Sequence, residues 1–171
     1  MTLAEFNALP AVQAETLLMN CCASARWTAT VASQRPFATL ETLRKAADSI
    51  WWKLDRADWL EAFSHHPQIG DKPATGSESA RQWAAGEQSG TRTASEDVKE
   101  RLARANRAYL EKFGYIYIVC ATGKSAEAML AILNQRLQNN APSEISIAAE
   151  QQRLIMRIRL DKLLAGEERS T

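Results

Sequence analysis

The residues best suited to chemistry lie between Phe63 and Gln88 of this 171-residue chain. Both histidines of the protein, His65 and His66, are adjacent there, and Pro67 follows them. Because a residue that precedes proline is disfavoured in the α conformation, the pattern predicts a helix that ends here with the His66 imidazole presented at its end. Imidazole titrates near neutral pH, so His66 is a candidate for acid–base chemistry.

A carboxylate and an arginine are the other candidate groups. Glu87 follows in the next helix-forming segment, and a carboxylate beside a histidine can orient it or share its acid–base role. Arg157 and Arg159 lie in the apolar run 155–160, where an arginine must reach solvent or meet an anion. Helical periodicity allows Arg159 to face inward. Residue types and spacing therefore suggest an anion site of His66, Glu87 and one of the two arginines.

Each of these residues also has a plainer interpretation. A single histidine, glutamate or arginine in a helical protein is more often structural or solvated than functional. His65, His66 and Asp71 lack the spacing of a strong metal site, so we expect no metal. Cys120 is most simply a small buried hydrophobe. The sequence contains no phosphate-binding glycine loop, nucleophile elbow or zinc signature.

Helical patterns dominate the chain, and they predict an all-α fold, a single-domain helical bundle over residues 1–171. Hydroxyl residues suited to cap helices, followed by apolar stripes at helical spacing, occur at Thr2, Thr39, Ser95 and Ser125. Glycines suited to end helices occur at Gly90, Gly114 and Gly166. Among the aromatic residues, we expect Trp51, Trp52 and Trp59 to pack in or near the core.

The run Tyr115–Cys120 is the one strand-like stretch. A single strand of six residues cannot form a sheet. We therefore expect one short extended segment between helices, whose backbone amides need partners from elsewhere.

The overall composition narrows the class of protein. With 21 basic and 20 acidic residues the net charge is +1, which argues against a nucleic-acid or membrane-surface partner. No apolar run approaches transmembrane length, and no secretory signal opens the chain. The three cysteines include two neighbours and no CxxC pair, a usage typical of a reducing, cytoplasmic compartment.

Four motifs in order carry a family resemblance. They are the Phe-x-x-His-Pro-x-Ile-Gly stretch over 63–70, the Glu87-Gln88 pair, Phe113-Gly114-Tyr115 leading into 118–125, and the run Arg157-Ile158-Arg159-Leu160-Asp161-Lys162-Leu163. Over nearly its whole length the chain resembles the 2-oxo-4-hydroxy-4-carboxy-5-ureidoimidazoline (OHCU) decarboxylases of urate breakdown.

The resemblance implies an all-α, commonly dimeric carboxy-lyase without metal or organic cofactor. Such an enzyme converts the ureidoimidazoline to S-allantoin in purine catabolism. Matched residue by residue, the resemblance implies that the catalytic residues are His66, Glu87 and Arg159. It implies that the substrate contacts come from Pro67, Gln88, Ile118, Val119 and Cys120.

One position departs from the family pattern. Many members carry a serine three residues before the glutamate of the Glu-Gln pair, and this chain has Ala84 there. The alternative function is a non-enzymatic helical ligand-binding or interaction module, which predicts that His66 and Glu87 lie far apart with no cleft. A helical metal-dependent hydrolase is a third interpretation.

Overall fold

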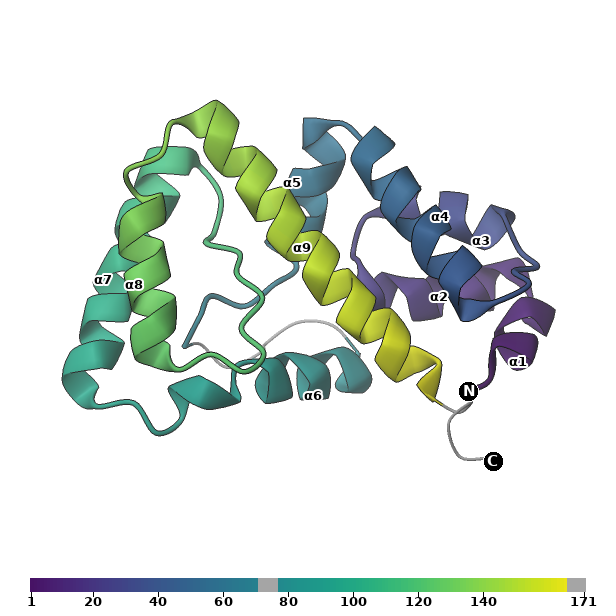
Figure 1. The fold of residues 1–171 in the computed structure, drawn as a ribbon, viewed down its shortest axis with the longest axis horizontal. Helices are drawn as coiled ribbons and strands as arrows, with labels where there is room; N and C mark the ends of the chain where they lie inside the picture. The colour runs from purple at the N-terminus through teal and green to yellow at the C-terminus, as the bar shows by residue number, and fades with distance from the viewer. Residues whose placement is uncertain (71–76, 166–171) are drawn as a thin grey trace. The chain divides into compact units, whose positions relative to one another are not determined.

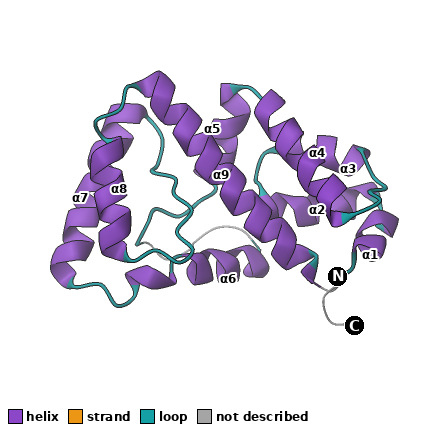
Figure 2. Cartoon of the chain, in the orientation of Figure 1, coloured by secondary structure: helices purple, strands orange, loops and turns teal. Residues whose placement is uncertain are grey.

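The computed structural model describes residues 1–70 and 77–165. All regular structure in these ranges is helical, with no strand, as the sequence predicts (Figure 2). None of the helices there is long and apolar enough to cross a membrane. The contacts divide the chain into two compact units. We call residues 63–152 the central unit, and residues 1–62 with the chain from Arg153 onward the terminal unit. The single domain over 1–171 stays a prediction.

The terminal unit is a layer of short helices around an apolar core. It contains α1 (Leu3–Ala8), α2 (Ala11–Cys21), α3 (Ala25–Ser33), α4 (Leu40–Lys53), most of α5 (Arg56–Ser64) and the C-terminal part of α9 (Ala141–Leu163). Helix α3 packs against both α2 and α4 (Figure 1). Four fully buried side chains, Leu18, Trp27, Leu43 and Trp51, fill the core of these helices.

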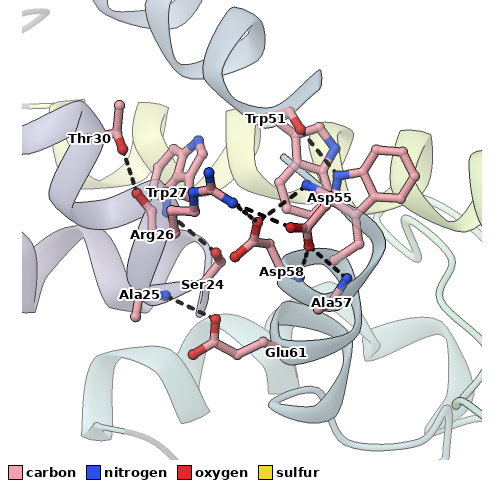
Figure 3. A network of polar contacts seen from close by, with 11 residues as sticks. Ser24, Ala25, Arg26, Trp27, Thr30, Trp51, Asp55, Ala57, Asp58 and Glu61 are labelled. Atoms are coloured by element: carbon pink, nitrogen blue, oxygen red, sulfur yellow. Dashed lines mark hydrogen bonds and ion pairs between the residues drawn. The ribbon is translucent and has the colours of Figure 1, made fainter. Parts of the chain in front are cut away.

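A polar network anchors α5 to the start of α3 (Figure 3). The Nη1 of Arg26 donates to a carboxylate oxygen of Asp55 at 3.4 Å and of Asp58 at 3.2 Å. One turn further along α5, the carboxylate of Glu61 accepts the backbone N–H of Ala25 at 3.2 Å. These contacts hold α5 in place. Residues 65–70, which we call the histidine segment, follow directly after this helix.

The central unit consists of α6 (Glu78–Glu87), a 3₁₀ turn η1 (Ser89–Thr91), α7 (Glu96–Phe113), α8 (Ala126–Arg136) and the N-terminal part of α9. Helices α7 and α8 pack side by side (Figure 1). A cluster of aromatic rings from Tyr109, Phe113, Tyr115 and Tyr117 lies in the core, and the ring centroids of Tyr109 and Phe113 are 4.6 Å apart. The cluster joins α7 to the extended segment that follows it.

The predicted helix starts are confirmed. The side chains of Thr2, Thr39, Ser95 and Ser125 each accept a backbone N–H from the first turn of the helix that follows. Gly114 ends α7 with a φ of 79°, in the left-handed region that glycine adopts without strain. Gly166 lies outside the described residues.

Two local predictions are wrong. Trp52 is 45% exposed. It follows the fully buried Trp51, and neighbours on a helix point about 100° apart, so only one of the two can face the core. Helix α6 ends at Glu87 rather than at Gly90, because the chain tightens into η1.

Candidate active site

Helix α5 ends at Ser64, just before the histidines, as the position of Pro67 predicts. The backbone N–H of His66 donates to the Phe63 carbonyl at 3.1 Å and closes the last turn. His65 is exposed, whereas His66 and Pro67 are half-buried. The Phe63 ring packs on Tyr115, with centroids 5.5 Å apart. The end of α5 is therefore fixed by a buried aromatic contact, and His66 is the more enclosed of the two imidazoles.

Two hydrogen bonds hold the chain just beyond Pro67. The side-chain Nδ2 of Asn106, on α7, donates to the Ile69 carbonyl at 3.1 Å. The backbone N–H of Gly70 donates to Oε1 of Gln88 at 3.0 Å. Gly70 has a φ of 97°, which side-chain-bearing residues rarely adopt. This turn therefore connects the histidine segment to the end of α6.

Glu87 occupies the last position of α6 and is 8% exposed. The interpretation of Glu87 as a solvated surface carboxylate is therefore wrong. Ala84 lies one helical turn earlier on the same face and is also buried. Its methyl group stands where a serine would bring a hydroxyl near the carboxylate. Ser89, an alternative source of a hydroxyl, is exposed in η1.

The extended segment is held by side chains instead of a neighbouring strand. Its residues Ile118, Val119 and Cys120 are buried. The Ile118 carbonyl accepts from Nη1 of Arg136 at 2.7 Å. The Cys120 N–H donates to Oε1 of Gln151 at 3.0 Å, and the Cys120 carbonyl accepts from Lys124 Nζ at 2.8 Å. The expectation that this backbone takes partners from elsewhere is confirmed.

A buried network of charged and polar side chains contacts this segment through Arg136. Glu144 accepts from the Tyr109 hydroxyl, from Arg136 Nε at 2.8 Å and from Asn139 Nδ2 at 2.7 Å. The guanidinium of Arg136 also lies 4.8 Å from the ring centroid of Tyr117. A buried ion pair needs hydrogen bonds of this kind, because desolvation of two charges is costly. Neither Arg136 nor Glu144 was a candidate from the sequence.

The network changes the protonation behaviour of its members. Burial, and then the hydrogen bond to Glu144, raise the pKa of Tyr109 well above its ordinary value. Burial likewise raises the pKa of Tyr117. Burial alone lowers the pKa of Arg136, but its hydrogen bond to Glu144 and the neighbouring groups outweigh burial and raise it. The network therefore contains an arginine that stays charged and two tyrosines that stay protonated.

The two candidate arginines differ in the terminal unit. Arg157 is half-buried and forms an ion pair with Asp48, with an Nε–Oδ1 distance of 3.1 Å. Arg153 shares the same carboxylate at 2.8 Å. Arg159 is 7% exposed, and its Nη1 donates to the Asn20 carbonyl at 3.2 Å. Arg159, which helical periodicity allows to face inward, is buried, whereas Arg157 forms a salt bridge.

Within the central unit, the structure connects the histidine segment to the Glu87-Gln88 pair through Gly70. Arg159 belongs to the terminal unit.

Sequence reasoning missed the residues that hold the site's backbone, namely Asn106, Arg136, Glu144 and Gln151. A polar residue on an apolar helical stripe was the available signal. Arg136 follows Met129 and Leu133 at helical spacing, and Glu144 precedes Ala148 by one turn. No group of three or more His, Cys, Asp or Glu side chains placed to hold a metal occurs among the described residues.

Comparison with protein families identifies one matching family model, described as OHCU decarboxylase, over residues 7–161. The chain is 35% identical over 150 residues to the uric acid degradation bifunctional protein TTL of Arabidopsis thaliana, covering 86% of this chain but 46% of that protein. The chain thus spans about half the length of that relative. It is also 25% identical over 135 residues to the 2-oxo-4-hydroxy-4-carboxy-5-ureidoimidazoline decarboxylase of Haloferax volcanii, covering 79% of each.

A solved structure resembles the chain over most of its length. The crystal structure of an OHCU decarboxylase in the presence of (S)-allantoin superposes with a TM-score of 0.77 at 34% identity. The match covers 88% of this chain and 98% of that one. The helical fold described above is therefore the fold of that decarboxylase.

Proposed function

We propose that this chain, which belongs to the OHCU decarboxylase family, removes CO₂ from 2-oxo-4-hydroxy-4-carboxy-5-ureidoimidazoline and releases S-allantoin. The match of the family model over residues 7–161 carries the proposal. The hydrogen bond from Gly70 to Gln88 supports it, because it connects the two motifs that hold His66 and Glu87. A non-enzymatic module gives no reason for that connection.

The reaction requires an acceptor for one electron pair. Breaking the bond between the ring carbon and its carboxylate releases CO₂ and leaves the bonding electrons on that carbon. The adjacent C=N bond of the ring takes up those electrons and its nitrogen takes up a proton, giving an enol. Protonation of the ureido-bearing carbon from one face, with loss of the enol proton, then gives the S product. Because the substrate itself accepts the electrons, no organic cofactor is required.

Each candidate residue has a role in this scheme. His66 steers the leaving carboxylate and helps deliver the proton to one face, a task suited to a group that titrates near neutral pH. Glu87 orients the ring hydroxyl or the ureido group. Arg159 binds an anionic or carbonyl oxygen of the substrate. The ion pair between Arg157 and Asp48 supports the choice of Arg159 over Arg157.

Further contacts come from Pro67, Gln88 and the backbone of Ile118, Val119 and Cys120. The side-chain oxygen of Gln88 accepts the N–H of Gly70, so the amide nitrogen of Gln88 keeps donor capacity for a ligand. Ala84 removes the hydroxyl that many relatives offer beside the glutamate. We therefore expect binding here to depend more on Glu87 and Gln88 themselves.

We also propose a homodimer that works in the cytoplasm. The three cysteines, Cys21, Cys22 and Cys120, are buried and form no disulfide, which supports a reducing compartment. The dimer rests on the family resemblance alone. Light scattering after size exclusion tests it, and a monomeric mass at micromolar concentration would contradict it.

The experiment that tests the activity is stereochemical. Urate oxidase and hydroxyisourate hydrolase generate the unstable substrate from urate in the cuvette, and circular dichroism follows allantoin with and without this protein. Rapid growth of the S-allantoin signal is the expected result. If the signal shows only the slow racemic background, the chain does not catalyse the decarboxylation.

A further inference from the structure

The extended segment lacks the hydrogen bonds that normally fix an extended backbone. Among the described residues no strand pairs with it. A buried backbone group without a partner is costly, so each bond that replaces the missing ladder matters for where this segment lies. The backbone groups of Ile118 and Cys120 form hydrogen bonds with the side chains of Arg136, Gln151 and Lys124.

Arg136 differs from the other two partners in burial and charge. It is 5% exposed, whereas Gln151 and Lys124 are half-buried. Its guanidinium contacts two groups at once: Nε donates to Glu144 at 2.8 Å, and Nη1 donates to the Ile118 carbonyl at 2.7 Å. The planar guanidinium presents these donors in a fixed fork that spans both acceptors, whereas a lysine has a single compact ammonium on a flexible stem.

Arg136 is itself held from several sides. Glu144 is fully buried and is oriented by Tyr109 and Asn139, and the Tyr117 ring lies beside the guanidinium. Glu144 and Asn139 come from α9 and from the turn before it, whereas Tyr109 comes from α7. Helices α7, α8 and α9 therefore all constrain the side chain that donates to the Ile118 carbonyl.

We propose that Arg136 is a positioning residue for the decarboxylation, because its hold on the Ile118 carbonyl sets where the backbone from Ile118 to Cys120 meets the substrate. The inference rests on the proposed function and on the predicted substrate contacts of this segment. Arg136 does not touch substrate; it acts through Ile118. Its loss therefore weakens substrate binding, while the chemical step that depends on His66 proceeds at its usual rate.

A merely structural ion pair would behave differently. If Arg136 only stabilises the core, replacing it lowers the unfolding temperature and leaves the KM of the folded fraction unchanged. Two variants separate the alternatives. Arg136→Lys keeps a cation beside Glu144 and removes the fork to Ile118. Tyr109→Phe removes the hydroxyl that donates to Glu144 and accepts from Nη2 of Arg136 at 3.4 Å, but it leaves both Nη1 of Arg136 and its acceptor, the Ile118 carbonyl, unchanged.

The test measures kcat and KM for both variants with substrate generated from urate, together with amide hydrogen exchange of the full chain. We expect Arg136→Lys to raise KM about tenfold with kcat within about twofold, the size of effect expected from loss of one charge-assisted hydrogen bond. Amide exchange at Val119 and Cys120 accelerates in the same variant. Tyr109→Phe lowers the unfolding temperature but leaves KM and that exchange unchanged.

Two results would overturn the inference. One is a wild-type KM and unchanged exchange at Val119 and Cys120 in Arg136→Lys. The other is an equal rise of KM in Tyr109→Phe, since KM would then follow stability alone. Failure of the proposed function is a separate result, because the unmodified chain would then produce no S-allantoin, while the exchange measurement would still report how Arg136 holds the segment.

Discussion

Gly70 donates its backbone N–H to the side-chain oxygen of Gln88 across 3.0 Å. This bond joins two segments that are separate in the sequence, the turn that follows His66 and the end of the helix that carries Glu87. Within the central unit, this hydrogen bond connects the motif that contains His66 to the motif that contains Glu87. Its geometry depends on glycine, because Gly70 has a φ of 97°.

The first prediction concerns this bond. Gln88→Ala should lower kcat/KM by about ten- to hundredfold, because the histidine turn loses its anchor and small misplacements of catalytic groups are costly. Gln88→Glu keeps an acceptor oxygen for Gly70 and should retain more activity than the alanine variant. Steady-state kinetics measure both. Gln82→Ala, at an exposed glutamine of α6, is the matched control, and a Gln88→Ala enzyme within about twofold of wild type would refute the prediction.

The second prediction separates the adjacent histidines. His66→Asn should reduce kcat by roughly 10²- to 10⁴-fold, the usual contribution of a positioned acid–base group. His65→Asn should change it little, because His65 is exposed at the helix end. Helical circular dichroism should be the same for both variants and the unmodified chain. Retained turnover in His66→Asn would remove His66 from the catalytic role.

Local chemistry explains how much of the fold was predictable. The caps at Thr39 and Ser125 and the stop at Gly114 follow from contacts within one turn of the chain, so a sequence pattern contains them. The prediction for Trp52 is wrong because hydrophobicity does not say which of two adjacent residues faces the core. That choice depends on which neighbouring helix supplies the opposing surface.

The same limit applies to the candidate site. The turn at His66 and Pro67 is local, whereas helical periodicity left open whether Arg159 faces inward. The contacts of Asn106 with Ile69 and of Arg136 with Ile118 join residues far apart in the sequence. A polar residue on an apolar stripe indicates that some buried partner exists, but only the packing of the helices identifies it.

The third prediction distinguishes Arg157 from Arg159, both on α9. Arg159→Gln should raise KM about tenfold or more, because a buried guanidinium that binds a substrate oxygen forms a charge-assisted hydrogen bond. Arg157→Gln should leave KM unchanged and lower the free energy of unfolding by about 1 kcal/mol or less, the usual range for a solvent-accessible ion pair. Kinetics and chemical denaturation measure the two effects. The reverse pattern would transfer the binding role to Arg157.

The last prediction follows from the raised pKa values of Tyr109 and Tyr117. In the unfolded chain both hydroxyls ionise near pH 10, whereas in the folded chain they remain protonated. The unfolded state therefore binds fewer protons than the native state at alkaline pH, and stability is retained below about pH 10 and lost as the pH rises beyond it. Each tyrosine should contribute a slope of about −1.4 kcal/mol per pH unit there.

Alkaline titration measures this effect through tyrosinate absorbance and circular dichroism. Absorbance from the tyrosinates of Tyr109 and Tyr117 should appear only as the helical signal disappears. Tyr117→Phe removes one titrating hydroxyl and should make the alkaline decline of stability shallower by one proton. If all three tyrosines ionise while the helices remain folded, Tyr109 and Tyr117 reach solvent at high pH and the buried network with Glu144 does not protect them.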